Sequence, residues 1–512
     1  MQSQMKYAIL WITVCIALCN SRASAEHLVL DADTQINLPS GFDAELLYEV
    51  PASQGSWVAM AFDPKGRLIV SDQDDKGVFR LTLTETEGAG VRVEHLEGFP
   101  YLPINWGRRR VGGALGFLYA FDSLYMSSMK GFYRIRDTDG DDTFDEFTLL
   151  KQLGVGYEHS AHSIIKTEDG QGLYLVTGNH TPLPPGIPSL QPAVWETDSL
   201  LQEMNDAMGH AVGIQPPAGW ICRITPDGKD WVMVASGFRN AVDIAINREG
   251  ELFTYDSDLE FDVGTPWYRP TRVNHVTSAS EFGWRPGSAK WPDYFEDSNG
   301  AVINIGPGSP TGISFGHHSN FPAPYQDKLF ICDWTFGSIY LIDMEEDGSS
   351  YVGTKTEFLN GQPLNISAMR FGPDGHMYFL VGGRNTDSRL YRIRYVGPPQ
   401  KGAGKRLVAN QDLRDLRHSL EVFHGNPHAG NTAITRAWPH LSHPDRNIRY
   451  AARLAIENQP VSLWQERVLR EEDQRALIHA SIALCRRGEG LWRYVTAADN
   501  TGSVGRGAAS RF

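Results

Sequence analysis

The residues best suited to chemistry are three histidines and a glutamate that stand close together in the sequence. Glu158-His159 and His162 lead into an apolar run, and His180 closely follows a second run. Asp169-Gly170 separates the runs and is typical of a tight turn between antiparallel strands. The open ends of such a hairpin lie side by side, so the spacing predicts that these side chains meet at one edge of a sheet. Imidazoles there can serve as a proton acceptor or as metal ligands.

The same kind of hairpin recurs along the first four-fifths of the chain, at residues 57–71, 114–127, 163–177, 243–255, 312–332 and 368–381. Six repeats of short strands predict a mainly β fold, a six-bladed β-propeller in which each hairpin is the inner half of a four-stranded blade. An open β-sandwich is the alternative, but it does not usually repeat one hairpin six times. We expect the propeller to occupy residues 26–396, with residues 26–56 leading into the first blade.

The pattern changes after the propeller. Residues 397–410 begin with a run rich in Gly and Pro and are predicted to be a linker. Apolar residues at helical spacing in 447–457 and 476–485 predict helices, and residues 441–445 resemble the start of a HEAT-type repeat. Residues 411–495 are therefore predicted to form a short α-helical, partial HEAT-like domain. Residues 496–512 lack apolar periodicity and are predicted to be disordered.

The first 25 residues have the pattern of a secretory signal peptide. Lys6 precedes an apolar run at 7–19, and Ala23-Ser24-Ala25 is a small-residue cleavage pattern. The run is short for a membrane span, so we expect a secreted or periplasmic protein with no transmembrane segment after cleavage. The net charge of −14 argues against a nucleic-acid partner. No C-x-x-C-H motif occurs in the 512 residues, so this chain attaches no c-type haem.

Polar residues gather at one end of the predicted hairpins. In a propeller, residues just before each first strand and just after each second strand share the face that surrounds the channel. The candidates there are His159, His162, Arg239, Asn240, Asp256, Asp258, Glu260 and Arg384, among other short polar residues. One interpretation is that such residues only satisfy loop backbone groups. The combination of histidines, an arginine and clustered carboxylates favours a binding face.

Four short motifs carry a resemblance to a known family. They are Glu158-His159, Gly237-Phe238-Arg239-Asn240, the glycine-rich residues 112–116, and residues 281–284. Together they resemble the soluble PQQ-dependent glucose/sorbosone dehydrogenase propellers over roughly residues 40–395. Residues 238–276 look still more like the propeller of large secreted bacterial "membrane-bound dehydrogenase" proteins, which often continue into HEAT repeats and a c-type haem domain.

The resemblance implies roles for individual residues. His159 falls where the dehydrogenases place a general base that takes a proton from a sugar hydroxyl, and Glu158 matches the neighbouring acid. Arg239 and Asn240 match residues that contact the cofactor. The family's cofactor is PQQ, which carries three carboxylates and is usually bound together with Ca²⁺. Because this chain has no haem motif, a separate c-type cytochrome would take the electrons.

Some of the family's cofactor contacts are replaced in this chain. Thr335 stands where the family has a lysine, and Asn365 and Ser367 stand where it has two arginines. Val111 stands where it has a glutamine. Fewer cations weaken the case for a tricarboxylate ligand. Arg384 could supply a replacement, as could residues 108–110, and His162 is a further candidate for holding the cofactor.

Two acidic segments are candidate sites for a hard cation. Carboxylates at Asp137, Asp139, Asp141 and Asp145 surround a glycine turn, which is typical of short calcium-binding loops, although the glycine position differs from an EF-hand. The alternative is a solvated acidic hairpin tip. Asp256-x-Asp258-x-Glu260 follows a predicted second strand and would need a cation or an arginine to offset its repulsion. A third possibility uses His159, His162 and His180 as ligands for Zn²⁺ or Cu²⁺.

Three hypotheses about function follow from these patterns. The first is a secreted oxidoreductase that oxidises a sugar or another alcohol with PQQ and Ca²⁺. The second is a propeller without catalysis that binds a carbohydrate or a protein and has lost the cofactor. The third is a metal-dependent hydrolase or lactonase that uses a metal on the channel face.

Overall fold

The computed structural model describes residues 26–29, 35–83, 90–100, 104–106, 109–111, 113–154, 159–192, 210–259, 268–286, 289–398 and 409–487. The predicted signal peptide at 1–25, the predicted tail at 496–512 and most of the predicted linker lie outside these ranges. Two candidate site residues, Glu158 and Glu260, also lie outside them.

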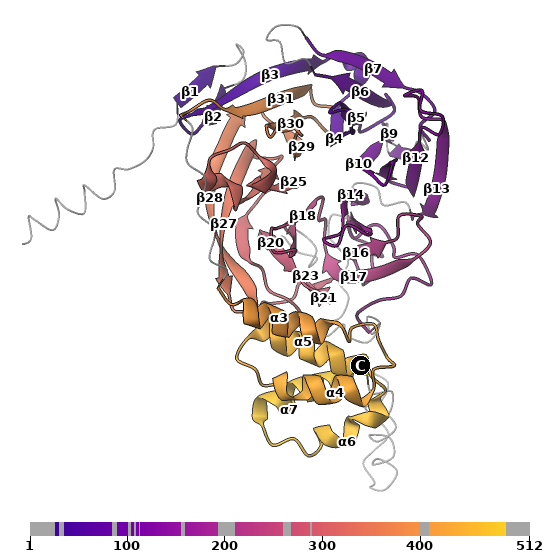
Figure 1. Ribbon diagram of the computed structural model, residues 1–512, viewed down its shortest axis with the longest axis vertical. Helices are drawn as coiled ribbons and strands as arrows, with labels where there is room; N and C mark the ends of the chain where they lie inside the picture. Colours follow the sequence, from indigo (N-terminus) through magenta and orange to yellow (C-terminus); the bar gives the residue numbers. More distant parts are fainter. Residues whose placement is uncertain are drawn as a thin grey trace, which may run out of the picture.

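The described part of the chain forms six antiparallel blades around a central axis, which confirms the predicted six-bladed β-propeller (Figure 1). From the innermost strand outward, the blades are β4 (Trp57–Phe62), β5 (Leu68–Asp72), β6 (Val78–Thr82) and β7 (Arg92–Leu96); β10 (Ala114–Ala120), β11 (Ser123–Ser128), β12 (Gly131–Arg136) and β13 (Glu146–Gln152); β14 (Ala161–Lys166), β15 (Leu173–Thr177), β16 (Gly219–Ile224) and β17 (Trp231–Phe238); β18 (Ile244–Ile246), β19 (Leu252–Asp256), β20 (Thr271–Val276) and β24 (Ile303–Gly306); β25 (Pro310–Phe315), β26 (Leu329–Asp333), β27 (Ser338–Asp347) and β28 (Ser350–Gln362); and β29 (Ile366–Phe371), β30 (Met377–Val381), β31 (Ser388–Tyr395) and β3 (Phe42–Val50).

Shorter elements decorate the blades. They are β8 (Ile104–Trp106) paired with β9 (Arg109–Val111), β21 (Ser280–Glu281) beside β17, β22 (Trp284–Arg285) paired with β23 (Ala289–Lys290), and helix α2 (Ala323–Gln326).

The first strands of the six predicted hairpins are the innermost strands. They contact one another in a closed ring, β4–β10–β14–β18–β25–β29–β4. The blades pack through apolar side chains of neighbouring sheets, such as Phe132 of one blade against Ile164 and Trp220 of the next. Second strands are buried on both faces, which is why they read as continuous apolar runs. Gly116 allows neighbouring blades to approach closely, because a Cβ atom there would lie 2.2 Å from the carbonyl oxygen of His162.

The N-terminal strands do not lead into the first blade, so that prediction was wrong. Strand β3 pairs antiparallel with β31 and forms the outer strand of the last blade. Strand β2 (Gln35–Leu38) pairs with β28, and β1 (Glu26–Val29) extends that sheet. Chain order alone favoured the nearest blade. Instead, strands from the two ends of the propeller share one sheet and close the ring by backbone hydrogen bonds.

Helices follow the propeller, as predicted. They are α3 (Gln411–Glu421), α4 (Asn431–Ala437), α5 (Arg446–Glu457), α6 (Gln465–Val468) and α7 (Gln474–Arg487). The central helix α5 packs against α3, α4 and α7. Asp445 begins it, because its side chain accepts hydrogen bonds from the N–H groups of Asn447 and Ile448. The HEAT-like character of this unit stays a prediction. None of the described helices has the length and apolar character to cross a membrane.

The helices dock on the propeller through buried charged groups (Figure 1). Glu251 lies just before β19, at the turn end of its hairpin, and is 4 % exposed. Its carboxylate is 2.5 Å from Nη2 of Arg417 in α3 and 2.8 Å from Nε2 of His275 in β20. His418 reaches the same carboxylate at 3.1 Å. The N-cap Asp445 also accepts a hydrogen bond from the Ser349 hydroxyl, so helix start and docking share one side chain.

Candidate functional site

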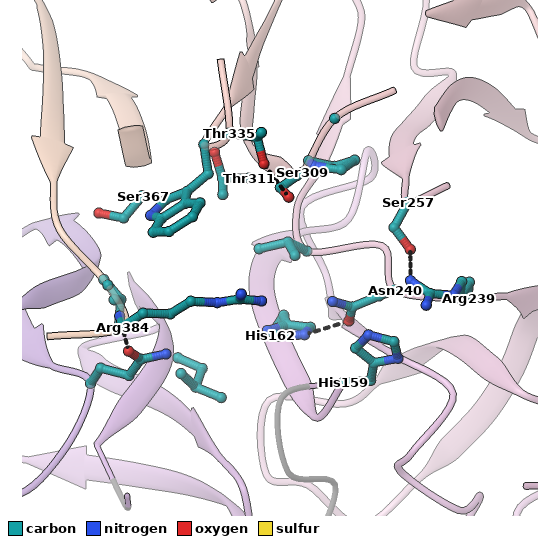
Figure 2. A pocket seen from close by; sticks show the side chains of 18 of the residues that line it. His159, His162, Arg239, Asn240, Ser257, Ser309, Thr311, Thr335, Ser367 and Arg384 are labelled. Carbon is teal, nitrogen blue, oxygen red and sulfur yellow. Dashed lines mark hydrogen bonds between the residues drawn. The ribbon is translucent and has the colours of Figure 1, made fainter. Parts of the chain in front are cut away.

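A pocket of about 530 Å³ opens on the propeller face where the first strands begin. It is lined by six of the predicted site residues: His159, His162, Arg239, Asn240, Asp258 and Arg384. These residues come from positions just before first strands or just after second strands of several blades, except that His162 is the second residue of the strand β14 itself. Figure 2 shows Arg384 on one side of the pocket and Arg239 on the other, with His162 and Asn240 between them.

His159 lies immediately before β14 and is 4 % exposed. Its Nδ1 atom is 2.6 Å from Oδ1 of Asn179, which follows β15. An amide oxygen can only accept, so Nδ1 carries the proton and the lone pair is on Nε2. Burial, the charge of Arg239 and the neighbouring imidazoles of His180 and His210 hold the pKa of His159 well below its usual value. His159 is therefore a neutral imidazole with an oriented lone pair.

His162 is held differently. Its Nε2 atom is 2.9 Å from Oδ1 of Asn240, so this nitrogen donates to the amide oxygen. Burial lowers the pKa of His162 to about 4, and the ring is neutral at physiological pH. The resemblance implied that Arg239 and Asn240 both contact a cofactor. In the structure Asn240 contacts His162, and all three residues line the same pocket.

The segment that carries Arg239 and Asn240 is fixed by Asp256 at the end of β19. The Asp256 carboxylate accepts hydrogen bonds from the backbone N–H groups of Arg239 (3.1 Å) and Asn240 (2.8 Å). It is also 3.1 Å from Nζ of Lys290, whose pKa burial lowers to about 8. The Arg239 guanidinium donates to the Ser257 hydroxyl at 3.3 Å (Figure 2). Asp256 thus fixes the backbone of Arg239 and Asn240, the residues predicted to contact a cofactor. Its role as a cation ligand stays a prediction.

Two other blades use an aspartate at the same place. Asp72 at the end of β5 accepts from the N–H of Ser56, and Asp333 at the end of β26 accepts from the N–H of Ser309. Each also accepts from N–H groups of its own following turn. Burial raises the pKa of both carboxyls. The recurring polar residues at this end of the hairpins therefore have a structural role in several blades, as the backbone interpretation predicted. Asp258, by contrast, lines the pocket.

Arg384 projects into the pocket from the loop after β30. Its guanidinium lies over the indole ring of Trp334, 5.3 Å from the centroid. Its backbone has φ 54°, a left-handed conformation that a non-glycine residue adopts at a cost. The Arg384 N–H donates to the Gln73 side chain at 2.5 Å, and the Trp334 indole N–H donates to the Gly382 carbonyl at 2.6 Å. The surrounding structure holds this arginine in place.

Of the three positions where the resemblance implied a cation, two lie at this pocket and Asn365 is not part of its lining. Thr335 and Ser367, which stand where the resembling dehydrogenases have basic residues, both line it. The Thr335 hydroxyl is 2.8 Å from the hydroxyl of Ser309, and Thr311 adds a third hydroxyl on the same side (Figure 2). In place of those cations, the pocket offers neutral oxygen donors and acceptors.

A third histidine joins His159 and His180. The rings of His159 and His180 have centroids 4.4 Å apart, and His210 lies 4.6 Å from the first and 4.7 Å from the second. One nitrogen from each ring can be chosen so that all three lie within 4.8 Å of one another. His162, which the sequence placed in this set, instead contacts Asn240. His210 replaces it.

The predicted calcium loop lies between β12 and β13, and its residues do not line the pocket. Oxygen atoms of Asp137, Asp139 and Asp141 lie within 4.8 Å of one another. The fourth predicted ligand, Asp145, accepts hydrogen bonds from the N–H and hydroxyl of Thr138. Asp142 pairs with Arg67, which holds the pKa of its carboxyl well below the usual value. The structure thus gathers three of the four predicted ligands.

Sequence reasoning missed two residues at the pocket, His210 and Trp334. His210 follows a long stretch with no strand pattern, and nothing in its spacing relates it to the hairpin at 159–180. Trp334 directly follows the second strand β26 and precedes Thr335, so the rule that placed the other pocket residues could have found it.

No protein-family model and no curated protein matches this chain. Solved structures that match include the PQQ-bound form of an aldose sugar dehydrogenase from Streptomyces coelicolor, with 17% identity, TM-score 0.49, and 70% of this chain and 99% of that one covered. A soluble aldose sugar dehydrogenase from Escherichia coli in the apo form has 16% identity, TM-score 0.47 and covers 69% and 99%. The PQQ domain of a pyranose dehydrogenase from Coprinopsis cinerea has 12% identity, TM-score 0.47 and covers 72% and 98%. At such values we infer function from the pocket residues alone.

Proposed function

We propose that this chain is an oxidoreductase that oxidises a sugar or another alcohol with a quinone-type cofactor bound in the pocket. One observation carries the proposal: two guanidinium groups, of Arg239 and Arg384, face one pocket of about 530 Å³ that also contains the buried imidazole of His159, whose Nδ1–H donates to Asn179. Cations that can hold an acidic cofactor and a base that can take a hydroxyl proton are the two requirements of this reaction.

The pocket residues fit PQQ, a flat aromatic quinone with three carboxylates. Arg239 and Arg384 would each pair with a carboxylate, and the hydroxyls of Ser309, Thr335 and Ser367 would donate to the remaining oxygens. The Trp334 indole gives the pocket an aromatic surface. Asp258 is the third charged residue of the described lining, and its carboxylate would hold a Ca²⁺ that offsets the negative charge of the cofactor.

When bound, a quinone cofactor accepts a hydride from the carbon that bears the substrate hydroxyl. The chain's own contribution is to the proton. Nε2 of His159 accepts the hydroxyl proton as the hydride leaves the carbon, which gives a carbonyl product and an imidazolium. Asn179 fixes the tautomer through Nδ1. His162, with its hydrogen bond to Asn240, orients substrate or cofactor oxygens.

Further parts of the proposal concern the surroundings of the enzyme. The signal-peptide pattern at 1–25 supports a secreted or periplasmic protein. The absence of a C-x-x-C-H motif supports transfer of electrons to a separate c-type cytochrome. The gathered oxygens of Asp137, Asp139 and Asp141 support a structural Ca²⁺ at the β12–β13 turn.

The test is to titrate the purified chain with PQQ, with and without Ca²⁺, and to follow thermal stability and dye-linked oxidation of a sugar and alcohol panel. We expect saturable stabilisation by PQQ and dye reduction that is lost in His159→Ala. His317→Ala is the matched control, because His317 is a partly buried histidine away from this pocket. Absence of any PQQ effect, together with no turnover, would contradict the proposal.

A second function is favoured by the hydroxyls that replace the family's cations. Thr335, Ser309, Thr311 and Ser367 form a neutral rim suited to the hydroxyls of a carbohydrate, which needs no cofactor. A binding propeller of this kind would be stabilised by an oligosaccharide and would not respond to PQQ. The same titration therefore distinguishes the two functions.

A further inference from the structure

Outside the proposed cofactor contacts, the most unusual feature of the pocket wall is the cluster of His159, His180 and His210. In each of the three pairs, the ring centroids are 4.4–4.7 Å apart. One nitrogen atom can be chosen from each ring so that all three atoms lie within 4.8 Å of one another. Stacking between aromatic rings would explain a pair of histidines, but it does not require a third ring at the same place. His317 and His318 show such a pair, with centroids 4.0 Å apart, and no group of three ligands includes them within the described ranges.

The cluster is held by backbone contacts from two directions. His159 and His180 stand at the open ends of the β14–β15 hairpin, where the N–H of His180 donates to the His159 carbonyl at 3.2 Å. His210 comes from a different part of the chain, and the next residue, Ala211, packs with Leu259 and Trp284 in an apolar cluster. Three histidine side chains from two parts of the chain thus meet at one point.

His159 also has the second contact that metal-binding histidines make. Its Nδ1–H donates to the Asn179 amide oxygen at 2.6 Å, which fixes the tautomer and the orientation of the ring. Around a tetrahedral ion with bonds of about 2.0–2.1 Å, ligand nitrogens lie about 3.3 Å apart. The rings therefore need to close by at most about 1.5 Å, which side-chain rotation can supply.

We infer that His159, His180 and His210 form a binding site for a transition-metal ion such as Zn²⁺ or Cu²⁺, with a fourth position open to the pocket. Imidazole ligands select this class of ion, whereas Ca²⁺ requires oxygen ligands. The fourth position is open because His159 and His210 both line the pocket. Three protein ligands plus one exchangeable position is the arrangement of catalytic rather than structural zinc sites.

The neighbouring Arg239 restricts what the fourth ligand can be. Arg239 lines the same pocket as His159 and His210, and its charge acts against a bare dication there. An anionic fourth ligand, either hydroxide or a carboxylate of a bound molecule, would offset both positive charges. The site is therefore suited to an oxyanion ligand shared between the metal and Arg239.

The inference does not rest on the proposed function, but the two share one atom. The Nε2 lone pair of His159 cannot bind a metal and accept a substrate proton at the same time. If both hold, Zn²⁺ inhibits PQQ-dependent turnover in proportion to the fraction of sites that it occupies, and a chelator restores it.

The test uses the full chain prepared without a histidine tag and stripped with a chelator. Co²⁺ is titrated and followed by calorimetry and visible absorption. We expect one Co²⁺ per chain, the intense absorption of a four-coordinate ion, displacement by Zn²⁺ and no displacement by Ca²⁺. His180→Ala and His210→Ala should each lose the intense band, and a His317→Ala, His318→Ala double variant should keep it.

Two results would overturn the inference: a weak six-coordinate spectrum in the unsubstituted chain, or an unchanged intense band in His210→Ala. If a variant fails to fold, Cu²⁺ bound to the unsubstituted chain still decides, because its electron paramagnetic resonance spectrum counts coupled nitrogens. Three nitrogens support the site, and one or none contradicts it. Neither measurement involves turnover, so the outcome is separate from that of the proposed oxidoreductase.

Discussion

Two groups of histidines in this molecule have different charged neighbours. Where the helices dock, His275 and His418 contact the carboxylate of Glu251, which Arg417 also approaches at 2.5 Å. In the pocket, the groups that act most strongly on His159 beyond burial are Arg239 and two more imidazoles, all of which disfavour a charged ring. The first cluster balances its charges, and the second does not. Imbalance of this kind is typical of sites where a ligand supplies the missing charge.

The first prediction concerns His159, and it has the largest expected effect. We expect His159→Ala to reduce dye-linked turnover by about 10²–10⁴-fold, the usual contribution of a general base. Thermal stability should stay the same or rise, because the substitution removes one of three crowded imidazoles. Steady-state kinetics and a thermal melt of the same preparation measure both. A large loss of stability, with turnover per folded molecule unchanged, would show that His159 has a structural role like that of the docking histidines and not a catalytic one.

The second prediction concerns Glu251. Glu251→Gln should lower the free energy of unfolding by about 1.5–3 kcal/mol, because the buried Arg417 loses one of its two carboxylate partners and keeps only Glu421. Chemical denaturation measures the change, and Glu249→Gln in the same turn is the matched control. We expect turnover of the folded enzyme to be unaffected, since Glu251 lies at the turn end of its hairpin and the pocket at the open end. Equal stability of the two variants would contradict the balanced-charge account.

Glu251 also predicts a pH dependence with a definite sign. Although burial alone would raise the pKa of Glu251, contacts with His275, His418 and Arg417 hold it far below its usual value. In the unfolded chain a glutamate takes up a proton near pH 4.3, so stability is lost as the pH falls below about 4.3. Denaturation curves between about pH 3 and 6 should show a steeper slope in the unsubstituted chain than in Glu251→Gln. Identical slopes would assign the acid sensitivity to other carboxyls.

The third prediction returns to the pocket. Arg384→Ala should weaken PQQ binding by about 1.5–3 kcal/mol, the contribution of a hydrogen bond to a charged group, or roughly ten- to a hundredfold. Arg248→Ala is the control, because its guanidinium pairs with Asp327 away from the pocket. Calorimetric titration of both variants measures the difference. Equal affinities would show that Arg239 and the hydroxyl rim hold the ligand without Arg384.

The sequence predicted those parts of the molecule that follow from local patterns. The six hairpins, and hence the face on which His159, Arg239 and Arg384 meet, follow from apolar runs and glycine turns. The pairing of β3 with β31 does not, because it joins segments more than 300 residues apart and leaves no local signal. His210 could not be placed for the same reason. Asp256 was recognised as a residue of this face, but its contact with Lys290 depends on a loop whose path no pattern encodes.

The smallest expected effect concerns the exposed acidic loop between β12 and β13. The question is whether its negative charges are offset by a bound ligand, as we propose for the pocket, or by the protein itself, as in the docking cluster. Oxygen atoms of Asp137, Asp139 and Asp141 lie within 4.8 Å of one another, and their carboxylates accept hydrogen bonds from turn N–H groups. We expect Ca²⁺ to raise the melting temperature by a few degrees at most, since the loop is exposed, and Asp139→Asn to remove that increase. Asp230→Asn, in the exposed turn of the next blade, should not. A Ca²⁺ effect that survives Asp139→Asn would direct attention to Asp258 in the pocket, where a calcium ion would bear on the cofactor and not only on a hairpin tip.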